Sequence, residues 1–200
     1  MFLARDPSAT LVERFLHGCR DLPLSYGEPI GLLEPLAHGR VLDDALVPIG
    51  RGEQDYARAR TALLAWKQFD VGWVGVFPRD APVEVGTEVA VLFRHLGFWS
   101  LNGCRILYKA GPAHDAARCG FAYGTLSNHA IAGEELFEVS LDDESGAVLY
   151  RIRATSWPRV LLAGLGLPIV RALQRRFRRD SAEAMRRAVA QRSSASSNTR

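Results

Sequence analysis

The chain has 200 residues, of which 48% are hydrophobic and 24% are charged, with a formal net charge of +3. This length allows one domain with a full hydrophobic core and excludes two domains of ordinary size, so we expect a single domain over residues 1–190. The positive charge is local, because residues 171–200 contain nine arginines against Asp180 and Glu183, whereas residues 1–170 are net acidic.

The first half of the chain predicts two helices. Ser8 is a suitable N-cap for an opening helix that ends near Gly18, within an N-terminal extension over residues 1–20. Residues 24–32 suggest a first strand, weakened by Pro29, and residues 53–68 have the apolar period of a second helix. Two glycines precede this helix, but without an apolar strand or a third glycine they do not indicate a nucleotide-binding loop.

From residue 72 onward the apolar period changes to two, which predicts a series of antiparallel strands joined by short turns. A closing helix over residues 168–190 follows, with apolar residues such as Leu173 and Phe177 on one face and arginines elsewhere. The fold class is therefore α+β, with the helix covering one face of the sheet. The predicted strands are 73–77, 88–95, 98–109, 118–127, 134–141 and 147–156.

Two of these strands carry unusual side chains. In residues 98–109, the positions of Arg105 and Lys109 predict that the alternate residues face inward: Phe98, Ser100, Asn102, Cys104, Ile106 and Tyr108. Inward polar groups such as Ser100 and Asn102 need a partner, which is a ligand, a water or another side chain. In residues 118–127, Gly120, Ala122 and Gly124 share one face, which predicts a bend or close approach by another element.

The three cysteines, Cys19, Cys104 and Cys119, have no spacing typical of a metal site or a disulfide framework. We therefore expect a reducing compartment and no metal or other cofactor. The N-terminus lacks the uninterrupted apolar core of a signal peptide, and the longest apolar stretch, residues 160–170, is too short to span a membrane. These features predict a cytoplasmic protein, with a disordered serine-rich tail over residues 191–200.

Several motifs occur together and in order: RHLGFWSLN at residues 94–102, FAYGTL at 121–126, His129, GEE at 133–135, RRF at 175–177 and DS at 180–181. The block from about residue 20 to 190 resembles the DUF1990 family, which is related to the helix-grip superfamily of START domains, the birch-pollen allergen and polyketide cyclases. The resemblance implies a curved antiparallel sheet wrapped around a long C-terminal helix, with a hydrophobic cavity between them. It implies no catalytic residues, and the first 20 residues depart from the usual helix-grip pattern.

The leading hypothesis from these observations is binding of a small hydrophobic or amphipathic molecule, such as a lipid, an isoprenoid or a polyketide, between the sheet and the closing helix. Apolar lining with a few polar groups is typical of such pockets, although aromatic residues at these positions also build a core. The candidate ligand-binding residues are Ser100, Asn102, Tyr123, Phe98, Trp66 and Phe177.

A second hypothesis is a cyclase or isomerase that uses the same cavity, with His95, Tyr123, His129 or Glu134 as acid or base. Glu134 and Glu135 are adjacent and point to opposite faces of a strand, so only one of them can face the cavity. Burial there would raise the pKa of that carboxyl. No histidine spacing is typical of a metal site, and no G-x-S-x-G elbow indicates a hydrolase.

A third hypothesis is an interaction module that docks a partner or an anionic membrane through Arg175, Arg176, Arg178 and Arg179. The same arginines also suit a solvated helix face or pairing with the acidic part of the chain. Nucleic-acid binding is disfavoured, because no recognised binding motif accompanies the arginines and the remainder of the chain is acidic.

Overall fold

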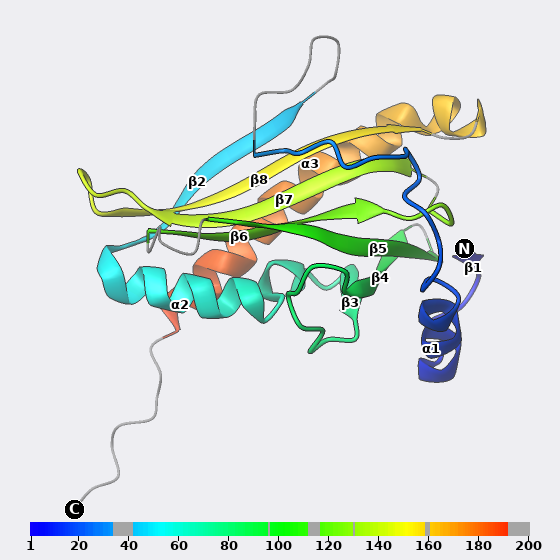
Figure 1. Ribbon diagram of the computed structural model, residues 1–200, viewed down its shortest axis with the longest axis horizontal. Helices are drawn as coiled ribbons and strands as arrows, with labels where there is room; N and C mark the ends of the chain where they lie inside the picture. Colours follow the sequence, from blue (N-terminus) through cyan, green and yellow to red (C-terminus); the bar gives the residue numbers. More distant parts are fainter. Residues whose placement is uncertain (34–41, 96, 112–116, 130, 159–160, 192–200) are drawn as a thin grey trace, which may run out of the picture.

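The computed structural model (Figure 1) describes residues 1–33, 42–95, 97–111, 117–129, 131–158 and 161–191, with side chains given outside 158–170. Its core is one antiparallel sheet in the order β2-β8-β7-β6-β5-β4-β3, and the short strand β1 pairs with β5. The strands are β1 (Phe2–Leu3), β2 (Asp43–Arg51), β3 (Val74–Phe77), β4 (Glu88–His95), β5 (Phe98–Ala110), β6 (Arg118–Thr125), β7 (Ile131–Leu141) and β8 (Ala147–Pro158).

Helices cover one face of the curved sheet, which we call the concave face. They are α2 (Gly52–Leu64), the short 3-10 helix η1 (Lys67–Phe69) and the C-terminal helix α3 (Leu161–Ala190), which runs along the sheet in Figure 1. Phe177 and Met185 of α3 are buried together with concave-face residues of the strands, such as Phe137. The chain is therefore an α+β protein whose antiparallel sheet wraps around a long C-terminal helix, as the sequence predicted.

The opposite, convex face is covered by the N-terminal part of the chain. Helix α1 (Ala9–His17) begins at its N-cap Ser8, as predicted, and packs Val12 against Leu101 of β5. Residues 24–33, which we call the strap, then cross the sheet, and Leu32 is buried against Ala122. The close approach predicted from the small residues of β6 is confirmed, because a Cβ on Gly124 would collide with the hydroxyl oxygen of Tyr26.

The structure differs from the predicted elements in three ways. The strap is not a strand, since it makes only an isolated bridge between Leu24 and Leu126, and its Gly27 and Gly31 adopt positive φ angles that interrupt extended structure. Strand β2 was missed, although it pairs with β8 along its length. The closing helix begins at Leu161, seven residues earlier than expected, because the helical backbone continues through Pro168.

The predicted face of strand 98–109 was correct for Cys104 and Ile106 but wrong at both ends. A register shift between Ile106 and Tyr108 turns the Tyr108 side chain to the convex face, where it packs in the cluster around Leu32. Phe98, at the other end, is 60% exposed and does not line an interior. The tail predicted over residues 191–200 lies outside the described residues except for Gln191.

Candidate functional site

Aromatic rings fill the space between the sheet and the helices. Phe69 of η1 is in contact with four of them, with ring centroids 5.2 Å from Phe177, 5.5 Å from Phe137, 5.7 Å from Trp66 and 6.5 Å from Tyr123. Such edge and tilted arrangements stabilise aromatic clusters. Trp66 and Phe177, two of the predicted ligand-binding residues, are therefore buried in one apolar cluster.

A hollow of about 440 Å³ opens beside this cluster at the edge strand β3. Trp66 and Phe69 of the cluster are among its lining residues, and the others are Ala65, Lys67, Asp70, Gly72, Val74, Gly75, Val76 and Arg79. The backbone of Trp66 explains the shape of this wall, since its left-handed conformation (φ 58°) ends α2 and turns the chain into η1. The indole nitrogen of Trp66 donates a hydrogen bond to the carbonyl oxygen of Ala81 at 2.8 Å, which fixes the ring.

A polar pair lies behind Phe69 on the concave face. The hydroxyl of Tyr123 in β6 donates a hydrogen bond to Oε2 of Glu135 in β7 at 2.6 Å. Burial raises the pKa of Glu135 to about 7, although the Tyr123 hydrogen bond opposes this shift. Burial also raises the pKa values of the Tyr123 hydroxyl and of the nearby Cys104 thiol, and the Glu135 charge adds to both shifts. The site therefore holds a carboxyl that gains or loses a proton near neutral pH.

Further polar side chains connect the concave face to the helices. The hydroxyl groups of Tyr150 in β8 and Ser181 in α3 are 2.8 Å apart, and the amide nitrogen of Gln174 donates to Ser156 at 2.8 Å. Gln68 of η1 is fully buried, and neither its amide nitrogen nor its amide oxygen has a partner among the described residues. A buried amide of this kind is available to a polar group of a ligand or to water.

Glu134, the carboxylate selected from the sequence, lies on the convex face and outside this interior. It accepts hydrogen bonds from the hydroxyl of Tyr26 at 2.9 Å, the backbone of Ile30 at 2.5 Å, the backbone of Gly31 at 3.2 Å and the hydroxyl of Tyr108 at 3.1 Å. These contacts hold the strap against the sheet. Its expected place at a cavity mouth was wrong, because the alternation of β7 directs its neighbour Glu135 to the concave face.

Glu135 is the main residue that the selection from sequence missed. The signal was present, since Glu135, Phe137 and Val139 alternate along one strand and the apolar side chains of Phe137 and Val139 favour the buried face. The sequence analysis had named Glu134 and Glu135 as alternatives, and the parity set by Phe137 selects Glu135.

The two candidate histidines are held in local structure. Nδ1 of His129, in the turn between β6 and β7, accepts a hydrogen bond from the backbone of Ile131 at 3.0 Å. His95 ends β4, opposite Phe98 of β5, and its Nε2 is shielded from solvent without a partner among the described residues.

Asn102 and Ser100, the inward polar residues of β5, bond to each other and to the sheet. The amide nitrogen of Asn102 donates to the hydroxyl oxygen of Ser100 at 3.1 Å, to the carbonyl oxygen of Ser100 at 3.1 Å and to that of Val91 at 3.3 Å. One of the three partners considered from the sequence, another side chain, is therefore present. Two backbone carbonyl groups accept further hydrogen bonds from Asn102.

The arginines of α3 are largely paired with carboxylates of the same chain. Arg176 and Arg179 form ion pairs with Asp180, and Arg178 pairs with Asp43 of β2. The Arg176 guanidinium also lies over the ring of Trp73, 4.5 Å from its centroid. Arg175 is exposed. Of the four arginines, two therefore pair within α3 and one pairs with the acidic part of the chain, and membrane contact through the cluster stays a prediction.

The described residues contain neither a cluster of metal ligands nor a helix that could cross a membrane. Within the described residues, no group of three or more histidine, cysteine, aspartate or glutamate side chains is placed to hold a metal ion. The cysteines Cys19, Cys104 and Cys119 are free thiols. No helix in the described part of the chain combines the length and apolar character that crossing a membrane requires.

Comparisons with known proteins identify relatives along nearly the whole chain. A sequence profile described as "Domain of unknown function (DUF1990)" matches residues 30–184. A UPF0548 protein of Dictyostelium discoideum is 30% identical over 207 residues, covering 94% of this chain and 96% of the relative. A UPF0548 protein of Arabidopsis thaliana is 34% identical over 154 residues, covering 74% and 72%.

Among solved structures, a hypothetical protein of Helicobacter pylori aligns with a TM-score of 0.50 at 10% sequence identity, covering 72% of this chain and 83% of that one. At this level of identity the likeness concerns the fold alone. The profile match begins within the strap, so most of the convex-face cover lies outside the shared region, whereas the concave site lies inside it except for the C-terminal end of α3.

Proposed function

The chain belongs to the DUF1990 family, and we propose that it binds a small hydrophobic or amphipathic molecule, such as a lipid, an isoprenoid or a polyketide, in its concave interior. The observation that carries this proposal is the hollow at β3, whose lining includes Trp66 and Phe69 of the aromatic cluster. Its volume of about 440 Å³ lies within the usual range of small-molecule pockets, roughly 300–1,000 Å³.

The polarity of the surroundings favours a ligand with one polar group. The lining of the hollow is more polar than apolar: Lys67, Asp70 and Arg79 supply charges, and the valines Val74 and Val76 supply an apolar part. Behind Phe69, the Tyr123–Glu135 pair offers a hydroxyl and a carboxyl to a hydroxyl or carbonyl group of a ligand that displaces the Phe69 ring. An apolar body with one hydrogen-bonding group therefore matches both parts of the site.

The test is a binding assay in which the hollow is filled by a side chain. Native mass spectrometry with fatty acids, isoprenoid alcohols and aromatic polyketides identifies a ligand, and Ala65→Trp places an indole at the wall of the hollow. Ala57→Trp is the matched control, because Ala57 is exposed on α2, the helix that ends next to Ala65, and does not line the hollow.

We expect Ala65→Trp to weaken binding at least about tenfold and Ala57→Trp to leave it unchanged, since a filled hollow excludes the ligand body. Two results would contradict the proposal. One is that no panel compound binds and protein purified from cells carries no extractable molecule. The other is that both tryptophan variants bind the identified ligand as tightly as the parent chain.

A second candidate function is proton transfer on the bound molecule, and the observation in its favour is the pKa of Glu135 at about 7. A carboxyl with this pKa serves as a general base or acid near neutral pH, for example at a carbon next to a carbonyl group. The experiment incubates an identified carbonyl ligand with the protein in deuterated water and follows exchange at that carbon by NMR.

Exchange that rises with pH through an apparent pKa near 7, and that Glu135→Gln abolishes without changing ligand affinity, is the expected result for proton transfer. Exchange at the uncatalysed rate in the parent chain, with the ligand bound, would leave binding as the function and exclude this activity for that ligand.

A further inference from the structure

A second hollow lies on the convex face, on the opposite side of the sheet from the proposed ligand site. Its volume is about 360 Å³, and its floor consists of side chains from four neighbouring strands, β5 to β8. The strap forms one wall through Leu32 and Leu33. The remaining lining residues are Lys109, Gly111, Arg118, Leu136, Glu138, Arg151 and Arg153.

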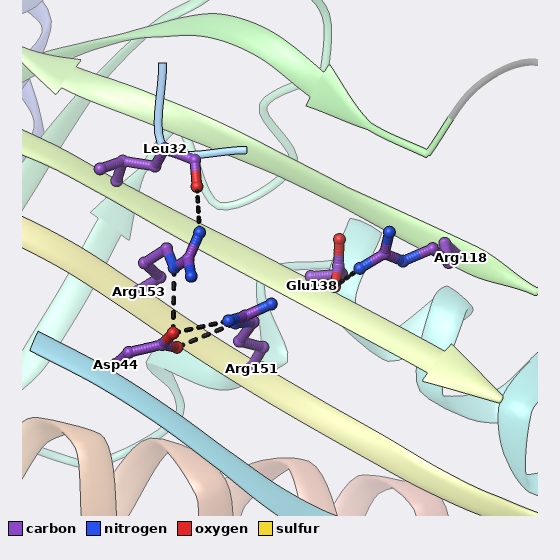
Figure 2. A network of polar contacts seen from close by, with 6 residues as sticks. All are labelled: Leu32, Asp44, Arg118, Glu138, Arg151 and Arg153. Atoms are coloured by element: carbon purple, nitrogen blue, oxygen red, sulfur yellow. Dashed lines mark hydrogen bonds and ion pairs between the residues drawn. The ribbon is translucent and has the colours of Figure 1, made fainter. Parts of the chain in front are cut away.

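Arginines and carboxylates alternate across this floor (Figure 2). Arg118 donates to Glu138 at 3.1 Å, and Glu138 lies directly opposite Arg151 in the β7–β8 register. Asp44 of β2 then accepts two hydrogen bonds from Arg151, at 2.8 and 2.6 Å, and one from Arg153 at 3.0 Å. Three arginines therefore share two carboxylates, which leaves a net positive charge along the row.

Lys109 also lines the hollow, but in the β5–β6 register it lies opposite Phe121, a residue of the concave-face core, and its ammonium group pairs with Glu84. The positive charge that faces the hollow therefore comes from the arginines. Arg118, Arg151 and Arg153 each have more N–H groups than their hydrogen bonds to described residues use. The planar arrangement of these donors suits the oxygens of a carboxylate or a phosphate.

The cationic row is held in place. The side chain of Arg153 is only 15% exposed, and its Nη1 donates to the carbonyl oxygen of Leu32 at 2.8 Å. The backbone nitrogen of Leu32 in turn donates to the hydroxyl of Tyr108 at 2.6 Å. The glutamate of the row, Glu138, is 4% exposed. Partly buried, anchored charges interact more strongly with a ligand than solvated charges do.

Apolar side chains stand next to these charges. Leu33 of the strap is 45% exposed at the wall, and Leu136 lies in the floor. From this arrangement we propose that the convex hollow is a second binding site, for a small organic anion with a phosphate or carboxylate head and an apolar group. The head bonds to Arg118 and Arg153, and the apolar group packs on the leucines.

The proposal is tested by calorimetric titration of the full chain with hexyl phosphate, hexanoate, inorganic phosphate and hexanol. We expect one of the two amphipathic anions to bind at least about tenfold more tightly than inorganic phosphate or hexanol, because only the anions engage both parts of the site. Equal affinities for hexanol and both anions, or no detectable binding of either anion, would overturn the proposal.

The variant Arg118→Gln removes one charged donor whose side chain is 48% exposed, so the fold should tolerate it. Arg60→Gln is the control, because Arg60 is exposed on α2 and changes the net charge equally without lining the hollow. We expect about a fivefold or larger loss of affinity in Arg118→Gln and none in Arg60→Gln. Equal losses of affinity in the two variants would mean that net charge alone determines anion binding, and would overturn the proposal.

This site is independent of the proposed concave site, and Ala65→Trp separates the two. Anion binding that persists in Ala65→Trp supports the convex site, whereas its loss there would place the anion in the concave interior and contradict the proposal. Sedimentation with phosphatidylcholine vesicles, with and without phosphatidic acid, then identifies the source of the anion. Co-sedimentation that requires phosphatidic acid and Arg118 indicates a lipid head group, and binding of soluble anions alone indicates a free metabolite.

Discussion

The substitution Glu135→Gln tests whether this carboxyl is as strongly perturbed as its surroundings indicate. Glu135 is the charged group of the concave face next to Tyr123, and burial raises its pKa from 4.5 to about 7. Glutamine keeps the size of the side chain and an oxygen that accepts the Tyr123 hydrogen bond, but it does not ionise in this range. The variant therefore removes the titration and keeps the contacts.

The sign of the effect follows from proton linkage. Below pH 4.5 the carboxyl is protonated in both the folded and the unfolded chain, so it contributes no pH dependence. Between pH 4.5 and about 7 the folded chain holds a proton that the unfolded chain has released, so the free energy of unfolding falls as pH rises. The shift corresponds to a loss of about 3 kcal/mol across this window, as an upper value.

Urea denaturation of the parent chain and of Glu135→Gln at pH 4.5, 5.5, 6.5 and 7.5 measures this loss. The variant should become more stable relative to the parent as pH rises, by up to about 3 kcal/mol at the highest pH. The pKa of Asp44 and that of Asp180 are lowered, so these groups titrate below the window and cancel in the comparison. If the difference in free energy of unfolding between the two chains does not change with pH, the raised pKa of Glu135 is refuted.

Three other substitutions test the packing of both faces by chemical denaturation. Phe177→Ala should lower the free energy of unfolding by about 3–5 kcal/mol, because it opens a cavity between α3 and the sheet, and a loss below about 1 kcal/mol would contradict the tight aromatic interior. Ser181→Ala should cost about 1–3 kcal/mol by leaving the Tyr150 hydroxyl unpaired, and adding Tyr150→Phe should recover most of this loss, whereas additive losses would disprove the coupling. Gly124→Ala should cost about 1–3 kcal/mol through its collision with the Tyr26 hydroxyl, and the cost should be smaller in a Tyr26→Phe background; an equal cost in both backgrounds would show that the strap does not press on β6.

The fold was largely predictable from sequence because its β7 and β8 strands alternate cleanly and its closing helix has a continuous apolar face. Residues 147–156 show the alternation best, and β8 lies inside the sheet with both neighbours paired. Strand β2 was missed since it begins with two aspartates and contains Pro48, features that disfavour a strand by local preference. Pairing with β8 and the ion pairs of Asp44 supply the stabilisation that the local sequence lacks.

The candidate site was predictable in part. The aromatic residues Trp66, Tyr123 and Phe177 were selected from their spacing, and the structure brings all three to the concave face, with Phe69 in contact with each. The hollow itself depends on the left-handed backbone of Trp66, which no local pattern indicated. The convex hollow was beyond sequence analysis, because it joins the strap to strands that are more than 70 residues away in the chain.

The central claim is that the hollow beside Trp66 and Phe69 admits a hydrophobic molecule. Methyl NMR of valine-labelled protein, titrated with the neutral probe 1-decanol, tests it most directly, because Val74 and Val76 line the hollow and Val12 of α1 packs against the opposite face of the sheet. If the hollow binds the probe, the methyl signals of Val74 and Val76 should shift saturably and those of Val12 should not change. Unshifted Val74 and Val76 signals, or equal shifts at all three residues, would contradict it.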